Sequence, residues 1–544
     1  MKADLSRTTF NRLKHFSRVV AQQGRVQVDA DWNEQSSIML YQLRRLAADI
    51  IGRSGGPAGN LGFGLSPLDP NVASNAMDFV IGAGHYYVDG ILCEVDATWL
   101  PVAFPDAKSA TKVQIPTVTV DGLAFRPGQY VGLLDAEPGS KVVPVPSARI
   151  TDVDYANRIL TLTDIAKFIS AGPKQARLQR LTTFLTQPEA TVENLDGDLL
   201  QIYLDVWERL VTYVEDDAIR EVALNGPDTA ARTKVVWQVK ALPTKADACL
   251  SPAELGDLLQ PANRGRLKAR VRPGPTDTDP CTIDPDASYR GHENQLYRVE
   301  IHTGNTGEKS PGSTFKWSRE NGAVVFPIVS GGGTSTLVLE SLGRDDRFGL
   351  AEGDWVAIED DDSVFRNRAA PLLRVQSIRR GSRSVVLAGD VPGDVGKDPA
   401  KHPLIRRWDH RQGDPAEGGL TLGTDNAALI PDAAAGQEGW LELEDGVEVQ
   451  FVDPENAVYR TGDYWLIPAR VATGDVEWPA ETVPGDPEKR PLAMLPDGVI
   501  HHYASLGLVA WDGKAASLGR ECRLQIPGAV LVPAAKRVKV TPGK

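Results

Sequence analysis

The stretch FRPGQYVGL (Phe125–Leu133) recurs as LAEGDWVAI (Leu350–Ile358), an offset of 353 − 128 = 225 residues between the two glycines. In both places a Gly-polar-aromatic turn starts a strand, and a loop and a Val- or Leu-rich hairpin follow. Strands this short bury their apolar face only by closing on themselves. The repeat therefore predicts two small β-barrel modules, at residues 121–165 and 345–392.

Outside the repeat, the chain is a succession of short β-patterned runs broken by Gly, Pro, Asn and Asp. Single hydrophobic cores stop growing at roughly 250–300 residues, so 544 residues should form several domains. We expect a mainly β, multidomain fold with a short helical N-terminal element, sandwich- or barrel-like domains and the two inserted modules. The predicted parts are a strand pair, helix and linker (1–70), a main β scaffold (71–120 and 190–344), the two modules, a surface helix (166–189) and a C-terminal β region with a basic tail (393–544).

The N-terminal element predicts two short strands around Gln22–Arg25 and then a helix. Asn33 is a suitable N-cap, and Gly52 stands where a C′ glycine belongs. An apolar stripe recurs at helical spacing between them, formed by Met39, Leu43, Leu46 and Ile50. This stripe either packs on the domain's own core or forms a seam with another subunit, because its spacing suits both.

A strand pair and one helix have too little apolar area to stand alone, and the Gly/Pro-rich segment 52–70 is predicted to be a linker. The N-terminal element must therefore borrow a surface, from the chain's own sheet, another copy or a second protein. We expect it to be an attachment or oligomerisation device, with Met39, Leu43, Leu46 and Ile50 as its interface residues. Two further local predictions are a polar helix over Ile165–Thr186 and a hairpin at Asn321-Gly322.

Charge and cysteine usage exclude several classes of protein. The net charge of −13 is spread along the chain, which argues against nucleic acid as a partner. The basic clusters Arg264–Arg272 and Ala535–Lys544 are short and lack interleaved aromatics. The four cysteines are far apart and without C-x-x-C spacing, so we expect no zinc site, no disulfide scaffold and folding under reducing conditions. No apolar run is long enough to span a bilayer, so no membrane insertion is expected.

Catalytic signatures are mostly missing. None of the eight histidines forms a metal-binding motif, and no phosphate-binding loop occurs. The acidic runs Glu359–Asp362 and Asp277–Asp279 are weak calcium candidates that lack the EF-hand pattern. A glycosidase needs only two carboxylates, and eleven Trp residues could line a sugar groove, although their dispersal suits core anchors better. We expect no catalytic residue, metal or cofactor.

The stretch HFSRVVAQQGRVQVDADWNEQ (His15–Gln35) resembles the N-terminal signature of a family encoded beside baseplate and sheath genes of extracellular contractile injection systems. The similarity extends over nearly the whole chain. It includes the stretches Tyr203–Arg209, Gly226–Thr229, Val236–Val239, Tyr289–Glu300, Phe315–Gly322, Gly462–Trp465 and His501–Tyr503.

This resemblance implies a non-enzymatic, structural component of a phage-tail-like particle, a cage or fibre-like protein at the baseplate. Its partners would be other copies of itself and other baseplate proteins. It would be assembled in the cytoplasm and released as part of an extracellular particle. The rival class is a tail-fibre-like adhesin or glycan-processing appendage, with a surface glycan as its ligand.

Overall fold

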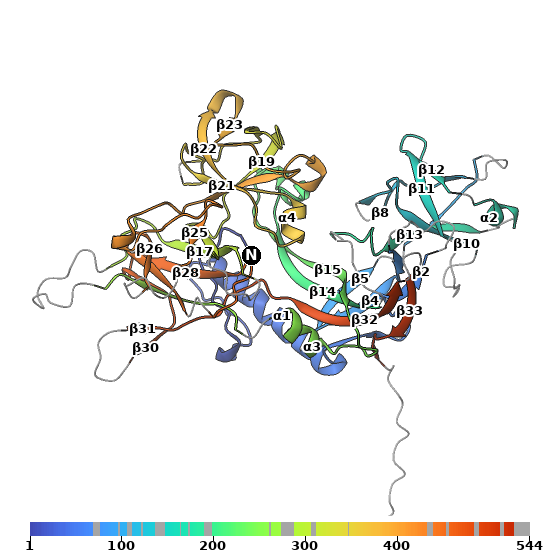
Figure 1. Cartoon of the computed structure of the whole chain (residues 1–544), viewed down its shortest axis with the longest axis horizontal. Coiled ribbons are helices and arrows are strands. Elements are labelled where there is room, and N and C mark those ends of the chain that lie inside the picture. Colours follow the sequence, from blue (N-terminus) through green and yellow to red (C-terminus); the bar gives the residue numbers. More distant parts are fainter. Residues whose placement is uncertain are drawn as a thin grey trace, which may run out of the picture. The chain divides into compact units, whose positions relative to one another are not determined.

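The computed structural model describes most of the chain, namely residues 1–68, 77–95, 98–105, 111–120, 123–135, 147–163, 165–171, 175–189, 199–260, 263–273, 288–305, 312–345, 347–431, 439–452, 456–482, 489–511 and 516–526. Strands far outnumber helices among these residues (Figure 1), which form two compact units. Unit 1 comprises Met1–Gln42, Trp207–Val236 and Gly256–His501, and unit 2 comprises Leu43–Val206, Trp237–Leu255 and His502–Lys544. The expectation of a mainly β, multidomain fold is confirmed.

Unit 1 is built on two sheets that share a core. A five-stranded sheet has the order β25 (Ala428–Leu429), β18 (Thr314–Ser318), β17 (Gln295–Thr303), β28 (Tyr464–Arg470) and β29 (Asp475–Val476). A three-stranded sheet has the order β16 (Arg266–Val271), β27 (Val447–Val452) and β26 (Leu441–Glu444). Aromatic rings from both sheets, including Tyr297, Trp317, Phe451 and Trp465, fill the core between them. The strands β30 (Ala480–Thr482) and β31 (Lys489–Pro491) form a separate pair.

A closed six-stranded barrel completes unit 1. Its order is β19 (Val325–Ser330), β20 (Thr336–Leu339), β23 (Ser384–Leu387), β22 (Leu372–Arg379), β21 (Trp355–Glu359) and β24 (Leu404–Trp408). Side chains that point inward from these strands, such as Phe326, Leu337, Val356 and Ile405, are almost fully buried. Short strands therefore bury their apolar face by closure, as the sequence predicts.

Unit 2 contains an eight-stranded sheet, two four-stranded sheets and a small strand pair. The largest contains β2 (Leu65–Pro67), β3 (Phe79–Ile81), β13 (Ala176–Thr183), β10 (Tyr130–Asp135), β11 (Ser147–Asp154), β12 (Ile159–Leu162) and β7 (Lys112–Gln114), with β6 (Trp99–Pro101) also paired to β13. One four-stranded sheet has the order β34 (Gln525–Ile526), β1 (Ser54–Pro57), β4 (Gly84–Val88) and β5 (Ile91–Val95). The other has the order β15 (Arg232–Pro243), β14 (Leu199–Val211), β32 (His502–Trp511) and β33 (Ala516–Glu521), of which Trp207–Val211 and Arg232–Val236 belong to unit 1. The small pair is β8 (Thr119–Val120) and β9 (Leu123–Ala124).

Four α-helices occur among the described residues, and α1 is by far the longest. They are α1 (Asp29–Ile51), α2 (Ala166–Ser170), α3 (Pro252–Leu259) and α4 (Asp361–Phe365). Six 3-10 turns also occur there, at Arg12–Lys14, Asp217–Ile219, Val222–Leu224, Arg380–Ser382, Pro399–Lys401 and Pro415–Glu417. No described helix has the length and apolar character needed to cross a membrane.

The internal repeat is reproduced in the strand pairing of the two units. Tyr130 pairs with Arg149 in unit 2, and Trp355 pairs with Arg374 in unit 1. Each residue of the second pair stands 225 positions after its counterpart in the first pair, which is the offset of the sequence repeat. The β11–β12 and β22–β23 pairs share their register, with a bulge at equivalent positions between Ile150 and Asp152 and between Val375 and Ser377. Gly128 and Gly353 begin the two copies with φ of 92° and 94°. Each unit thus contains one copy of the repeated strand pattern, which belongs to the closed barrel in unit 1 and to the eight-stranded sheet in unit 2.

The repeated pairing extends beyond the predicted ranges 121–165 and 345–392. The strands β6, β7 and β13 of unit 2 correspond to β19, β20 and β24 of unit 1. The isolated bridge between Ala103 and Gln114 stands where the barrel of unit 1 pairs Ser330 with Val338. Both copies therefore contain six equivalent strands.

Two local predictions in this part of the chain are wrong. The helix predicted over Ile165–Thr186 and 166–189 is limited to α2, because Ala176–Thr183 forms β13 between β3 and β10. The hairpin at Asn321-Gly322 forms only its turn, with φ of 51° and 67°. The strands on either side of this turn separate, since β18 pairs with β17 and β25 whereas β19 joins the barrel.

The predicted linker 52–70 is also wrong over its described residues. Residues 54–57 form β1 and residues 65–67 form β2, both within sheets. The glycines here permit close packing: a Cβ on Gly62 would lie 2.4 Å from the carbonyl carbon of Gly84. Glycine richness therefore marks backbone approach and not flexibility in this segment.

Candidate functional site: an anchored N-terminal arm and an exposed helix

The N-terminal residues contact three separate sequence motifs of unit 1. The carbonyl oxygen of Met1 accepts hydrogen bonds from Arg298 Nη1 at 3.3 Å and from Asn321 Nδ2 at 3.0 Å. Asn321 Nδ2 also lies 2.8 Å from the carbonyl oxygen of Ala3. Tyr464, on β28, places its ring under the Arg298 guanidinium, 3.6 Å from the centroid. The stretches containing Tyr289–Glu300, Phe315–Gly322 and Gly462–Trp465 thus meet around the N-terminal residues.

Lys2 enters a buried cluster of charges. Its Nζ atom lies 3.2 Å from Glu300 Oε1 and 3.4 Å from Glu359 Oε1. Glu300 also binds Arg298 at 2.6 Å and Lys316 at 3.5 Å, and Arg406 lies 3.0 Å from Glu359. The two glutamate side chains are only 5% and 7% exposed, so each relies on these cations for compensation.

The pKa values of this cluster follow from burial and from the neighbouring charges. Burial alone would raise the pKa of Glu300, but Lys2, Arg298 and Lys316 outweigh it and hold that pKa well below its ordinary value. The same balance, with Arg406 as the main cation, brings the pKa of Glu359 to about 2. Burial lowers the pKa of Lys316 to about 8. Glu300 and Glu359 are therefore both ionised at neutral pH, and their charges hold Lys2 in place.

Two buried histidines lie near the same cluster. Desolvation, with Lys316 as a further contribution, lowers the pKa of His302 to about 3. Desolvation also lowers the pKa of His410 to about 4, although His410 Nε2 lies 3.0 Å from the carbonyl oxygen of Asn426. The His410 ring stacks on Trp355 at 5.9 Å. Both rings are neutral at neutral pH and pack as core residues.

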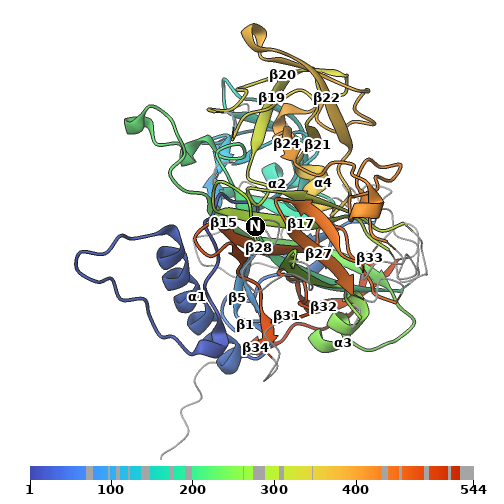
Figure 2. The same cartoon turned by 90° about the vertical axis from the view of Figure 1, so that its left-hand side faces the viewer.

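From the anchor, the chain continues as an arm, Leu5–Val28, that contacts the start of α1. The Ser6 amide donates to Asp29 Oδ2 at 2.9 Å, Thr9 Oγ1 donates to Glu34 Oε2 at 2.7 Å, and the Val19 amide donates to Gln35 Oε1 at 2.7 Å. Figure 2 shows the arm as a loop beside α1. The strand pair predicted around Gln22–Arg25 is wrong: the segment forms only a turn and pairs with no strand in the described part of the chain.

A groove of about 520 Å³ separates the arm from the first turns of α1. Its lining includes Val19, Val20, Val26, Trp32 and Gln35. Val26 is 87% exposed and Trp32 69% exposed, which is unusual for side chains of this type. The groove is therefore a largely apolar surface within the stretch His15–Gln35.

The four predicted interface residues share one exposed face of α1. Their exposed fractions are 61% for Met39, 64% for Leu43, 58% for Leu46 and 70% for Ile50. The opposite face is the one that packs, with Ala30 and Ile38 buried. The stripe is thus not part of the chain's own core, so that alternative is wrong. It remains available to another molecule.

The C-terminal half of α1 approaches the β4–β5 turn within unit 2. A Cβ on Gly90, whose φ is +81°, would lie 2.1 Å from the carbonyl oxygen of Arg44. Beside this turn, Asp89 binds Arg53 at 3.0 Å and His502 Nδ1 at 2.8 Å. Burial would raise the pKa of Asp89, but the hydrogen bonds from His502 and Arg53 hold it at about 2. The helix position in this unit is therefore fixed by a tight turn.

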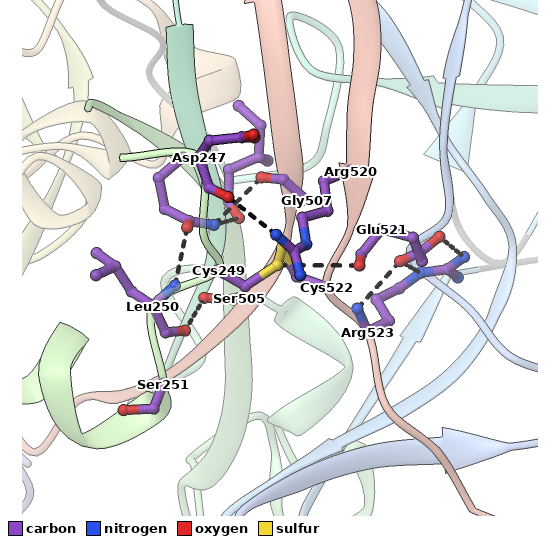
Figure 3. The surroundings of a disulfide bond; sticks show 12 residues. Asp247, Cys249, Leu250, Ser251, Ser505, Gly507, Arg520, Glu521, Cys522 and Arg523 are labelled. Carbon is purple, nitrogen blue, oxygen red and sulfur yellow. Dashed lines mark hydrogen bonds and ion pairs between the residues drawn. A yellow bond between two sulfur atoms is a disulfide. The ribbon is translucent and has the colours of Figure 1, made fainter. Parts of the chain in front are cut away.

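A disulfide joins Cys249 to Cys522 in unit 2 (Figure 3). The two cysteines are 273 residues apart, and no spacing pattern in the sequence predicts this bond. Around the bond, Arg520 Nη1 donates to the carbonyl oxygen of Asp247 at 2.9 Å, and the Cys522 amide donates to that of Leu506 at 3.0 Å. The bond links residues 247–251 covalently to the segment that connects β33 to β34.

The other candidates from the sequence do not form sites among the described residues. Glu359 binds Lys2 and Arg406, Asp360 caps α4, and Asp361 and Asp362 contact His402 and Lys401 at 2.8 and 2.7 Å. No cluster of three or more metal-ligating side chains occurs in the described part of the chain. Asp277–Asp279 and Ala535–Lys544 lie outside the described residues.

Three arginines of the basic cluster Arg264–Arg272 are paired with acids of their own unit. Arg264 lies 2.6 Å from Asp463, and Arg270 and Arg272 lie 2.9 and 2.8 Å from Glu448.

Sequence reasoning missed the charge cluster because its members are far apart in the chain. One signal was present: Arg298, Glu300 and Lys316 stand between strongly apolar neighbours in strands, as in YRVEI (Tyr297–Ile301) and FKW (Phe315–Trp317). Charged side chains in such runs are buried and require partners.

No curated protein and no solved structure matches the chain. A family described as "Family of unknown function (DUF6519)" matches residues 1–113, 154–266 and 259–536, well over half of the sequence. The chain therefore belongs to this family, DUF6519.

Proposed function

We propose that the chain is a non-enzymatic structural component of a phage-tail-like contractile injection particle, a cage or fibre-like protein at the baseplate. The assignment to a particle rests on the sequence resemblance. The structural observation that carries an assembly role is the exposed apolar face of α1, next to an arm that is anchored in unit 1. Isolated apolar side chains on a surface are common, but a continuous apolar stripe marks a contact.

The chemistry of the buried charge cluster supports a structural role over a catalytic one. Glu300 and Glu359 contact Lys2, Arg298, Lys316 and Arg406, and these contacts hold the N-terminal residues. A general acid or base needs a pKa near the working pH and access to a substrate. Both glutamates instead have low pKa values and almost no exposure.

The Cys249–Cys522 disulfide supports the release of the chain from the cytoplasm. Disulfides persist in oxidising surroundings and are rare in reduced cytosol. We therefore place assembly in the cytoplasm, with the thiols reduced, and oxidation in the released extracellular particle. The partners in this scheme are other copies of the chain and other baseplate proteins.

The alternative, a glycan-binding or glycan-cleaving appendage, requires an aromatic platform beside two convergent carboxylates. The groove beside Trp32 is lined by one carboxylate, Asp31. A second cavity, of about 470 Å³, has Asp4, Asp29 and Glu320 in its lining but no aromatic ring. Glu320 there is held by Arg347 at 2.6 and 3.0 Å. These linings favour the assembly role.

The test is incorporation into particles. Cells that make the particle would express the wild-type chain, a Leu43→Glu/Leu46→Glu variant or a control Val222→Glu/Leu224→Glu variant, and the chain would be measured in sedimented particles. Val222 and Leu224 are 86% and 61% exposed but lie outside α1, so they match the charge change without touching the stripe. Wild type and control should co-sediment, and the α1 variant should be lost. Absence of the wild-type chain from particles would overturn the proposal, and a glycan array with a reducing-end assay would then test the alternative.

A further inference from the structure

The exposed stripe of α1 is longer than the four predicted interface residues. Residues 32, 36, 39, 43, 46 and 50 follow one another at alternating steps of four and three, the spacing of a coiled-coil seam. Five of the six are large and apolar, and each of these five is more than half exposed. The sixth is Ser36. The seam therefore runs along nearly the whole of this 23-residue helix.

We propose that two copies of the chain pair through this seam, with their α1 helices antiparallel. The seam is complementary to itself when reversed about its midpoint, because 32 + 50, 36 + 46 and 39 + 43 all equal 82. Trp32 then faces Ile50 of the second copy, Ser36 faces Leu46, and Met39 faces Leu43. A parallel pairing would instead place Trp32 against Trp32 and Ser36 against Ser36, leaving one layer crowded and one empty. The reversed register fills every layer.

The positions that flank the seam are compatible with this pairing. They are Asn33, Leu40 and Ala47 on one side and Gln35, Gln42 and Asp49 on the other. Asp49 is the single charge among them, and it already contacts Arg45 at 3.4 Å on its own helix. Two copies therefore meet without like charges opposed, and antiparallel helices also bring opposite ends of their dipoles together.

The area available suits a pair of copies once the arm is included. A helix of 23 residues presents a strip about 34 Å long and about 10 Å wide. Specific interfaces bury roughly 800 Å² on each partner. The strip needs additional surface to reach that size, and Val20 and Val26, 64% and 87% exposed beside Trp32, supply it. Ile50 of the second copy, opposite Trp32, would enter the groove that these residues line.

A two-fold arrangement follows from the same symmetry. Because each copy offers the same patch in the reverse direction, the contact closes after two copies and leaves no free seam. This inference does not depend on the particle: a dimer could form whether or not the chain belongs to a baseplate.

Two experiments on the full-length chain test the pairing. In analytical ultracentrifugation the wild type should sediment as a dimer, and Leu43→Glu/Leu46→Glu should raise the dissociation constant at least about a hundredfold, since it places carboxylates in a buried seam. Val222→Glu/Leu224→Glu should leave the dimer unchanged. A wild type that remains monomeric at its highest soluble concentration, or a dimer that the α1 variant does not weaken, would overturn the proposal. Unchanged circular dichroism would show that each variant is folded.

Cross-linking then tests the direction. A Met39→Cys chain mixed with a differently tagged Leu43→Cys chain should form a mixed disulfide dimer on mild oxidation. A Met39→Cys chain alone should not cross-link to itself. Self-cross-linking of Met39→Cys without the mixed product would show a parallel pair and contradict the reversed register. The native Cys93 is buried, and Cys249 and Cys522 are bonded to each other, so they do not compete.

Discussion

Lys2 and Glu300 lie 3.2 Å apart, which joins the first residues of the chain to the middle of β17. Glu300 is 5% exposed and has three cationic neighbours, so Lys2 completes an ion network that is already buried. The arm that follows is therefore held at both ends, by this network and by its contacts with the start of α1. The anchor fixes where α1 begins in unit 1.

This relationship predicts unequal effects of two substitutions. Glu300→Gln leaves Arg298 and Lys316 buried without their carboxylate and should cost about 3–5 kcal/mol in the free energy of unfolding. Lys2→Ala removes a partner that is 25% exposed and should cost about 1 kcal/mol while freeing the arm. Urea unfolding measures the first effect, and the rate of tryptic cleavage in the arm measures the second. Arg7→Ala, which breaks an exposed pair with Glu477, serves as the control and should change stability little. Equal tryptic rates for wild type and Lys2→Ala would contradict the anchor.

The buried histidines predict acid sensitivity of unit 1. The pKa values of His302 and His410 are about 3 and about 4 in the folded chain, below the ordinary value of 6.5. Below pH 6.5 these histidines therefore bind more protons in the unfolded chain than in the folded chain. The free energy of unfolding should be unaffected above pH 6.5 and should fall as the pH drops toward 4. Lys316, Asp425 and Glu300 face the pair and contribute to its titration.

The measurement is the urea midpoint as a function of pH for the wild type and for His302→Gln/His410→Gln. The variant should show a shallower loss of stability between pH 6.5 and 4. An identical slope in both proteins would mean that other groups cause the acid dependence.

The disulfide predicts a redox-dependent stability of unit 2. Cys249 and Cys522 are separated by 273 residues, and removing a native bond of this kind typically costs about 2–5 kcal/mol. A reductant should therefore lower the melting temperature of the wild type but not of Cys249→Ser/Cys522→Ser. Cys93→Ala, which keeps the bond, should retain the response to reductant. Thiol counting should find both cysteines reduced in cells and oxidised after release; oxidised thiols inside the producing cell would contradict the proposed timing.

Gly90 provides a test of the α1 position in unit 2. Gly90→Ala would place a Cβ 2.1 Å from the carbonyl oxygen of Arg44, in addition to the cost of a left-handed φ. Gly226→Ala has the same kind of backbone, with φ of +88°, but meets nothing within 4 Å. The control should lose about 1 kcal/mol of unfolding free energy, and Gly90→Ala distinctly more. Equal losses would show that the helix does not pack against the turn.

The sequence predicted those features that depend on local backbone chemistry. The two modules were recognisable because Gly128 and Gly353 occupy the same left-handed turn position, and the amphipathic pattern located α1. The predictions failed where distant partners decide the outcome. Ala176–Thr183 is a strand because β3 and β10 lie beside it, and the β18 and β19 strands part because each has a partner elsewhere.

The features of the candidate site also fall into those that local sequence predicts and those that depend on distant partners. The stripe of Met39, Leu43, Leu46 and Ile50 follows from helical spacing, and its exposure required the structure. The Lys2–Glu300 network and the Cys249–Cys522 bond join residues hundreds of positions apart, and no spacing rule links them. Only the apolar surroundings of Glu300 and Lys316 signalled that partners had to exist.

If the exposed face of α1 is a contact surface of an assembled particle, an electron cryo-microscopy map of the intact particle should show it. We expect the chain at the baseplate, with Met39, Leu43, Leu46 and Ile50 buried against another protein. A map in which the chain is present but these four side chains face solvent would contradict it.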